Sequence, residues 1–281
     1  ILNMNSNSNK THDNTIRNIK NEYTFTEIKS LVESLNKLKI LIIGETIIDQ
    51  YVFCEALGKS GKEPVLVLKD KVTENYLGGA AAIANNISNL TKNITLLTMI
   101  GEKKEFKNFI KKKLPQEVKT IFLNKKNSPT IIKKRFLDQI NKNKVLGVYS
   151  LNDDLLNHVD EKKFNTYLNK LLPKFDCVIV ADYGHGLISR DSANIICKKS
   201  KYLSLNAQIN AANVGYHSFE NYKNIKSVVI NASELQQNLR NRNLPIETLM
   251  RRFSQLCSIN DLIVTRGDSG AILYNRKNKK F

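Results

Sequence analysis

No stretch of this chain approaches the roughly 18 consecutive apolar residues that a membrane-spanning helix needs. The N-terminus lacks a basic segment followed by an apolar one, so it carries no secretory signal pattern. Cysteine is scarce, with four residues in 281 and no Cys-x-x-Cys pair, and the four histidines do not cluster. These absences exclude a disulfide scaffold and argue against a zinc site. They predict a cytoplasmic protein with reduced, buried thiols.

Charge of one sign dominates, because 44 lysines and arginines face 26 aspartates and glutamates, for a formal net charge of +18 at pH 7. Such an excess suggests an anionic partner. Lysine is nevertheless scattered along the whole chain, and no zinc-finger spacing, RNA-binding aromatic motif or long basic block is present. Nucleic-acid binding is therefore kept only as a minor alternative. Hydrophobic residues at 41% indicate an ordinary globular chain.

The beginning of the chain is polar. Residues 1–37 are rich in Asn, Ser and Lys, and they are predicted to form a linker followed by a short helix near 26–36. Thr24 or Thr26 is the candidate cap of this helix. Because the chain starts with Ile1 instead of Met, we expect it to be a piece of a longer polypeptide.

Residues 38–281 alternate short apolar runs with helical patterns, which predicts an α/β fold with a mostly parallel sheet. The predicted strands lie at 39–44, 94–99, 176–181, 227–230 and 262–265. The predicted helices between them lie at 80–90, 103–114 and 190–200. Extended segments at about 51–76 and 128–150 break this rhythm and predict a small β flap beside the sheet.

Candidate binding residues stand near the first predicted strand and the first predicted helix of this region. Asp49 follows the strand, and a carboxylate beyond a strand end can accept hydrogen bonds from sugar hydroxyls. Gly78 and Gly79 precede the helix, where paired glycines let backbone amides approach a ligand closely. The residues alone equally allow a helix cap at Asp49 and a tight turn at the glycines.

Two cations are spaced to lie together on the flap. Lys133 and Arg135 are two residues apart, so on a strand both side chains point to one face and Lys134 points to the other. Two cations on one face suit a phosphate, which Arg can grip with two parallel hydrogen bonds. The alternative is a solvated edge strand protected by lysine.

Polar residues also follow two later predicted strands. Asn231 and Glu234 come directly after one of them, and a Gly-rich turn with Thr265, Gly267 and Gly270 follows the next. A polar cap and a Gly-rich turn at neighbouring strand ends favour a phosphate cradle. The turn alone could equally be a plain hairpin.

Together these motifs resemble the PfkB/ribokinase family of sugar kinases. The resemblance rests on 44–49 (GETIID), 77–86 (LGGAAAIANN), 231–234 (NASE) and 264–270 (VTRGDSG). It implies a ribokinase-like three-layer α/β/α fold with the flap as a lid, and phosphorylation of a sugar hydroxyl with ATP and Mg²⁺. It also implies roles: substrate binding for Asp49, Gly78 and Gly79, and ATP binding for Asn231, Glu234, Thr265, Gly267 and Gly270, with Glu234 reaching Mg²⁺ indirectly.

Three further segments are similar to the heptose-7-phosphate kinase branch of that family, which occurs in ADP-heptose synthesis proteins: 63–65 (EPV), 129–135 (PTIIKKR) and 181–186 (ADYGHG). This similarity implies a sugar phosphate held partly by Lys133 and Arg135, with Asp182 in the same site. Members of the branch are often fused to a nucleotidyltransferase domain. Because the flap strand commonly pairs with a second subunit there, we expect a homodimer.

The chain departs from the family pattern at several places. Ala82 stands where the family usually has Asn, and 205–210 stands where many members carry an Asp-Pro-Lys-like stretch. The C-terminal Gly-Ala-Gly-Asp motif, which supplies the family's anion hole and catalytic base, is absent. We therefore assign no catalytic residue, expect the base beyond Phe281, and expect a C-terminally truncated, inactive and poorly soluble kinase domain. The alternative is a non-catalytic domain that binds sugar phosphate and nucleotide.

Overall fold

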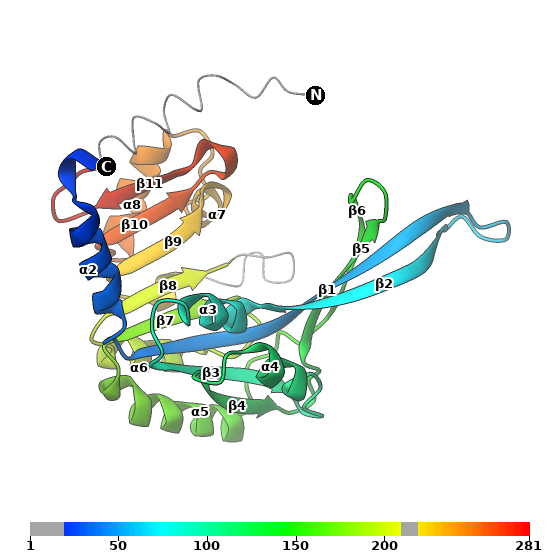
Figure 1. Cartoon of the computed structure of the whole chain (residues 1–281), viewed down its shortest axis with the longest axis horizontal. Coiled ribbons are helices and arrows are strands. Elements are labelled where there is room, and N and C mark those ends of the chain that lie inside the picture. Colours follow the sequence, from blue (N-terminus) through cyan, green and yellow to red (C-terminus); the bar gives the residue numbers. More distant parts are fainter. Residues whose placement is uncertain (1–19, 209–218) are drawn as a thin grey trace.

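The computed structural model describes residues 20–208 and 219–281 (Figure 1). Its main sheet runs in the order β11-β10-β9-β8-β7-β1-β3-β4. The bounds of these strands, in the same order, are Ala271–Asn275, Asp261–Thr265, Ser227–Asn231, Leu203–Ala207, Cys177–Asp182, Ile40–Lys59, Ile94–Gly101 and Lys119–Lys125. Neighbours in this sheet are parallel except for β10 and β11. The predicted mostly parallel sheet is confirmed.

Helices cover both faces of the sheet, because apolar side chains alternate along its central strand. Leu41 and Ile43 point into a core shared with α5 (His158–Leu171), α6 (Arg190–Lys199), α7 (Ala232–Asn238) and α8 (Ile246–Leu256). Ile40 and Ile42 point into a second core shared with α3 (Gly79–Ile87) and α4 (Lys107–Lys113). Burial of both side-chain rows makes the sheet the middle layer of three, as predicted.

The central strand β1 is much longer than its sequence pattern predicts. The prediction that this strand ends near Gly44 is wrong, because β1 continues through Gly44 to Lys59. A Cβ on Gly44 would lie 2.1 Å from the carbonyl oxygen of Ala181 on the neighbouring strand, so glycine here permits close strand packing. The strand therefore leaves the main sheet without a break, and its second half belongs to the flap.

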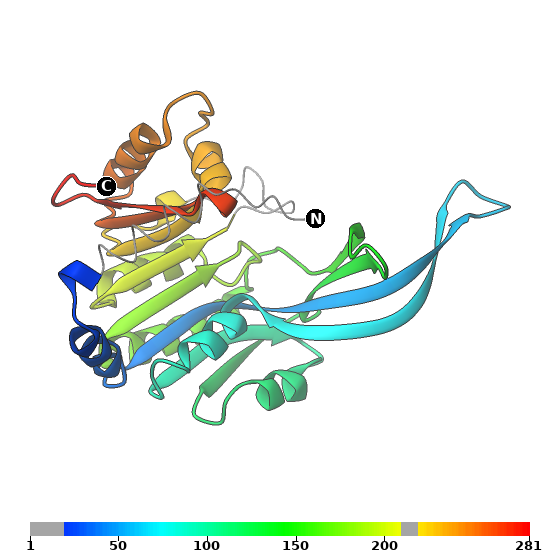
Figure 2. The same ribbon diagram turned by 45° about the horizontal axis from the view of Figure 1, so that its top comes forward.

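The flap is built on this second half of β1. It pairs antiparallel with β2 (Leu66–Gly78) and parallel with β5 (Ile131–Asp138). Strand β5 pairs in turn with β6 (Lys144–Ser150). Figures 1 and 2 show the β1–β2 ribbon extending far from the body of the molecule, with β5 and β6 beside its base. The predicted strands outside the main sheet are therefore present.

The helix predicted near 26–36 is α2 (Phe25–Leu35), and it begins at the first of its two candidate caps. The Thr24 hydroxyl accepts a hydrogen bond from the amide of Glu27, and the Glu27 carboxylate accepts one from the amide of Thr24. This reciprocal pair satisfies two amides that a helix start leaves open. No residue of α2 is buried. The remaining short helices are η1 (Leu172–Lys174), η2 (Phe219–Asn221) and η3 (Gly267–Ser269).

Cys54 and Cys257 are buried, Cys177 and Cys197 are half-buried, and no pair of them is bridged. No cluster of three or more potential metal ligands occurs among the described side chains. None of the helices in residues 20–208 and 219–281 is long and apolar enough to cross a bilayer.

Candidate active site

Some of the residues singled out in the sequence lie where parallel strands of the main sheet end, and others lie on the flap. Asp49 does not follow a strand end as predicted, because it lies inside β1, paired with Lys133 of β5. Asp182 closes β7, and its carbonyl accepts a hydrogen bond from the amide of Gln208 after β8. The Gln208 side chain in turn bonds Glu234 at the start of α7. Asn231 at the end of β9 pairs in register with Thr265 of β10. These strand ends therefore connect a flap end, with Asp49, to a hairpin end, with Thr265.

At the flap end, two predicted ligands of the substrate bind one another. Arg135 Nη1 on β5 donates to Asp49 Oδ1 on β1 at 2.5 Å, and both side chains are about three-quarters buried. The Arg135 guanidinium also lies 5.5 Å from the centre of the Tyr51 ring. Stacking and the ion pair together hold the guanidinium in place. A ligand at this end would meet Asp49 and Arg135 as one unit.

Lys133 lies directly across from Asp49 in the β1–β5 register and is only 7% exposed. Its ammonium lies 5.8 Å from the centre of the Tyr149 ring and 6.0 Å from that of Tyr183. Within the described residues it makes no hydrogen bond or ion pair. Burial lowers the pKa of Lys133, partly offset by the nearby charge of Asp49. A cation in so dry a position is poorly compensated by its own protein.

The two glycines at the start of α3 have a packing explanation. A Cβ on Gly78 would lie 2.3 Å from Asp49 Oδ2, and a Cβ on Gly79 would lie 2.2 Å from the carbonyl oxygen of Glu45. Gly79 also has φ +58°, a backbone conformation that disfavours other residues. Both glycines therefore let the start of α3 pack tightly against β1. Their contact with a substrate stays a prediction.

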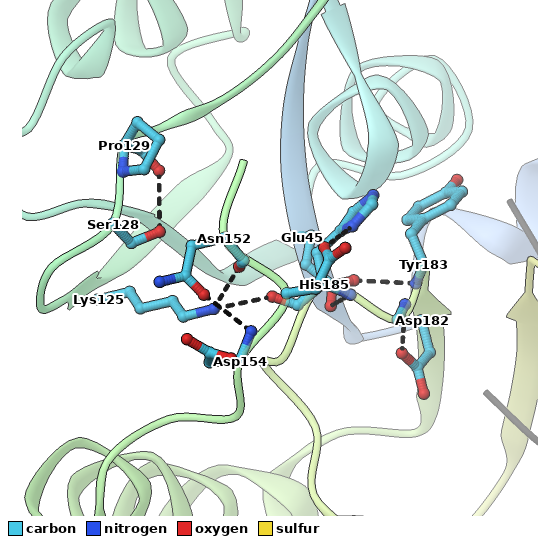
Figure 3. A network of polar contacts seen from close by, with 11 residues as sticks. Glu45, Lys125, Ser128, Pro129, Asn152, Asp154, Asp182, Tyr183 and His185 are labelled. Atoms are coloured by element: carbon cyan, nitrogen blue, oxygen red, sulfur yellow. Dashed lines mark hydrogen bonds and ion pairs between the residues drawn. The ribbon is translucent and has the colours of Figure 1, made fainter. Parts of the chain in front are cut away.

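A buried polar network underlies this end of the site (Figure 3). The Glu45 carboxylate, fully buried on β1, accepts hydrogen bonds from the amides of Tyr183 at 3.0 Å and His185 at 3.2 Å. Burial raises the pKa of Glu45 to about 7, and the charge of Asp182 adds to the shift. Asp182 itself accepts from the Tyr222 hydroxyl at 2.6 Å and the Gly184 amide at 3.1 Å.

Lys125 ties this network to the loop before α5. Its ammonium donates to the carbonyl oxygens of Asn152 at 2.6 Å and His185 at 3.1 Å, and burial lowers the pKa of Lys125. Sequence reasoning missed Glu45, Lys125 and His185 as members of the site. Glu45 and His185 did lie inside motifs that the sequence offered, but nothing local marks Lys125, because its partners are backbone carbonyls far along the chain.

At the hairpin end, the Asn-x-x-Glu motif is a helix cap. Asn231 Oδ1 accepts from the amide of Glu234 at 2.9 Å, and Glu234 Oε2 accepts from the amide of Asn231 at 3.0 Å. This capping box begins α7 and accounts for the spacing of the two residues. Burial raises the pKa of Glu234, and its hydrogen bonds to Asn231 oppose the shift.

The Gly-rich turn is the hairpin between β10 and β11, which the sequence had left as one of two alternatives. Gly267 and Gly270 have φ +56° and +76°, and Arg266 Nη2 closes the turn on the Ser269 carbonyl at 2.8 Å. The turn also forms one wall of a groove of about 640 Å³ whose other wall is the start of α7. The groove is lined by Asn231, Ala232, Ser233, Gln236, Ile246, Thr265, Arg266, Gly267 and Ser269.

Comparison with known proteins shows the family of this chain. The sequence pattern of the pfkB family carbohydrate kinases matches residues 37–281. This chain belongs to that family. The members of that family are carbohydrate kinases, phosphotransferases with an alcohol acceptor, and the predicted family is confirmed.

Curated relatives lie on the predicted branch. The bifunctional protein HldE of Campylobacter jejuni is 27% identical over 245 residues, which are 86% of this chain and 50% of that protein. HldE of Helicobacter pylori is 32% identical over 151 residues, which are 53% of this chain and 32% of that protein. The chain thus spans about half or less of the length of these relatives.

Solved structures share the fold at low identity. Phosphofructokinase-2 from Escherichia coli, in complex with fructose-6-phosphate, superposes with a TM-score of 0.66 at 13% identity, covering 86% of this chain and 78% of that one. Ribokinase from Arabidopsis thaliana, complexed with ribose and ATP, gives 0.59 at 15% identity, covering 85% and 75%. The predicted ribokinase-like α/β fold is confirmed.

Proposed function

We propose that this chain binds a sugar phosphate of the heptose-7-phosphate type at the flap end and ATP at the hairpin end, as the kinase part of a longer enzyme. The observation that carries the proposal is Lys133, a nearly buried cation that no described residue neutralises by direct contact. An isolated buried ammonium is costly, and a phosphate dianion would offset that cost.

Arg135 and Asp49 complete the substrate site of this proposal. Arg135 lies on the same face of β5 as Lys133, so one phosphate can reach both cations. The fork of the guanidinium leaves nitrogen atoms beyond the one that bonds Asp49. Asp49 keeps its second carboxylate oxygen, which can accept hydrogen bonds from sugar hydroxyls. A phosphate and neighbouring hydroxyls on one ligand match this set of groups.

The groove at the hairpin end supports ATP binding. Its volume of about 640 Å³ falls in the usual range for small-molecule sites, and amide and hydroxyl groups of the turn line it. Mg²⁺ fits this end only through water, because the Glu234 carboxylate is already held by Asn231 and Gln208. Bound there, Mg²⁺ would neutralise charge on the ATP phosphates, and Asn231 and Glu234 would orient its water ligands.

The carboxylates of the flap end favour a second candidate, binding without chemistry. Asp49 is paired with Arg135, Asp182 accepts from Tyr222, and Glu45 accepts two backbone amides. None of these three groups is poised to take a proton from a substrate hydroxyl. In our proposal that base lies in sequence beyond Phe281, in a polypeptide that also carries a nucleotidyltransferase domain.

Calorimetry and a coupled kinase assay test both candidates. The 281-residue chain should bind heptose 7-phosphate and ATP–Mg²⁺ with little or no turnover, and the product of the full reading frame should transfer phosphate. Binding without turnover by the longer product would establish the non-catalytic alternative. Failure of the chain to bind any sugar phosphate, or unchanged binding by Lys133→Met, would refute the proposed site.

The flap also supports the proposal of a homodimer. Every residue of β6 is exposed, including Val145, Leu146 and Val148, and Leu66 and Val72 of β2 are more than half exposed. Apolar side chains in such number on a projecting ribbon fit an interface between copies. Light scattering should give a dimer, and Leu146→Lys with Val148→Lys should give a monomer. A monomeric wild-type chain at micromolar concentration would contradict this proposal.

A further inference from the structure

His185 carries a buried nitrogen whose hydrogen-bonding capacity is unused. The residue lies in the turn after β7, and its side chain is 0% exposed. Its Nδ1 lies 2.7 Å from Asp153 Oδ1. Its Nε2 is buried and has no hydrogen-bond partner among the described residues. A buried polar atom left without a partner costs about 1–3 kcal/mol, so the atom points to a group that the protein itself does not supply.

The hydrogen bond between His185 and Asp153 determines which kind of partner Nε2 can bind. An ionised carboxylate only accepts hydrogen bonds, so Nδ1 must donate to Asp153 and carries the ring proton. Burial lowers the pKa of His185, and the charges of Lys133 and Lys125 lower it further against the effect of Asp153, so the ring is neutral at pH 7. Nε2 is then unprotonated and carries a lone pair, so it can only accept a hydrogen bond from a donor such as a hydroxyl.

Lys133, in the same part of the site, has hydrogen-bond donors and lacks an acceptor among the described residues. Its ammonium lies 6.0 Å from the centre of the Tyr183 ring, and Tyr183 and His185 both donate their amides to the Glu45 carboxylate. Lys133 and His185 therefore lie in the same part of the site. Among residues 20–208 and 219–281, the Lys133 ammonium finds no acceptor and His185 Nε2 finds no donor. A single ligand fills both needs if it offers an anionic oxygen and a neighbouring hydroxyl. A phosphate ester with a hydroxyl on the adjacent carbon has this arrangement.

We propose that His185, oriented by Asp153, determines specificity by accepting a hydrogen bond from the hydroxyl next to the phosphate-bearing carbon of the substrate. The inference rests on the proposed function, because it places the substrate phosphate on Lys133. Nε2 is buried in the ligand-free chain, so the side chains around it must move for the hydroxyl to reach it. The site then selects a hydroxylated phosphate ester over a plain one.

A matched pair of small phosphates tests this with the 281-residue chain at pH 8, where both are dianions. Glycerol 3-phosphate has the adjacent hydroxyl, and n-propyl phosphate lacks it. We expect glycerol 3-phosphate to bind about three to ten times more tightly, the value of one hydrogen bond to a buried acceptor. In His185→Phe this preference should vanish, while the affinity for n-propyl phosphate should be unchanged.

Nitrogen-15 NMR of labelled histidine gives an independent readout on the wild-type chain. We expect the His185 Nε2 resonance at the position of an unprotonated nitrogen, shifted by glycerol 3-phosphate and not by n-propyl phosphate. Asp153→Asn should reverse the tautomer and move the proton to Nε2, because an amide can donate to Nδ1. A protonated Nε2 in the wild type, or a resonance that neither ester moves, would overturn the inference.

The role of His185 and the proposed phosphate site are refuted by different binding results. If both esters bind through Lys133 with equal affinity, the role of His185 is refuted and the proposed phosphate site stands. If neither ester binds and Lys133→Met changes nothing, the proposed function is refuted together with this inference.

Discussion

Replacing Lys133 with Met is the sharpest test of the flap site, because it removes the ammonium and keeps an unbranched apolar stem of similar length. Charged hydrogen bonds contribute about 1.5–3 kcal/mol each, so loss of one contact to the substrate phosphate should weaken heptose 7-phosphate binding by about 10- to 100-fold. The same substitution should make the folded chain more stable. Burial lowers the pKa of Lys133, so the folded chain disfavours its charge, and an apolar replacement should raise the free energy of unfolding.

Lys134→Met is the matched control, one residue along β5 and on its opposite face. It should change neither ligand affinity nor, by more than about 0.5 kcal/mol, the free energy of unfolding. Calorimetry measures the affinities, and urea unfolding measures the stabilities. The reasoning is refuted if Lys133→Met binds heptose 7-phosphate like the wild type, or if it is destabilised by more than about 1 kcal/mol.

Three other changes should give measurable effects. Gly78→Ala places a Cβ 2.3 Å from the Asp49 carboxylate, so urea unfolding should show a loss of about 1–3 kcal/mol. Burial raises the pKa of Glu45 to about 7 from 4.5, so the folded state holds its proton more tightly. Stability should therefore fall as pH rises from about 4.5 through 7, and Glu45→Gln should flatten this slope in pH-dependent melts. Asp49→Asn removes the charge that faces Arg135, so calorimetry should show tighter binding of inorganic phosphate and weaker binding of the sugar phosphate. A parallel change in both affinities would contradict the assigned role of Asp49.

Sequence periodicity located the strands that are apolar on both faces and missed strands in which polar and apolar residues are mixed. The run at 176–181 is apolar on both faces and became β7 (Cys177–Asp182). Strand β8 (Leu203–Ala207) was missed because polar Ser204 and Asn206 alternate with its buried residues. Strand β4 (Lys119–Lys125) and helix α5 (His158–Leu171) carry lysines at many positions, which hides their buried faces. In such elements, polar side chains reduce the contrast between the buried and the solvent-facing side, and the local pattern becomes hard to interpret.

Spacing alone predicts which side chains share a strand face. The two-residue step from Lys133 to Arg135 puts both on one face of β5. The ion pair of Arg135 with Asp49 joins residues 86 positions apart, and no local signal announces it. His185 is marked by its burial and its unused nitrogen, which are properties of the folded chain.

The fold alone explains the residues of the sequence motifs, whereas it does not explain the buried residues that lack hydrogen-bond partners among the described side chains. Asn231 and Glu234 satisfy one another in a helix cap, and Gly78 is required by the Asp49 carboxylate beside it, so the fold alone would retain them. Lys133 gains only ring contacts and His185 gains one hydrogen bond to Asp153. The buried charge and the second ring nitrogen have no hydrogen-bond partner among the described residues, and both cost stability. A chain that needed only to fold would be more stable with apolar side chains at those two positions. Their presence is therefore the stronger argument for a ligand, and it bears on the substrate end of the cleft.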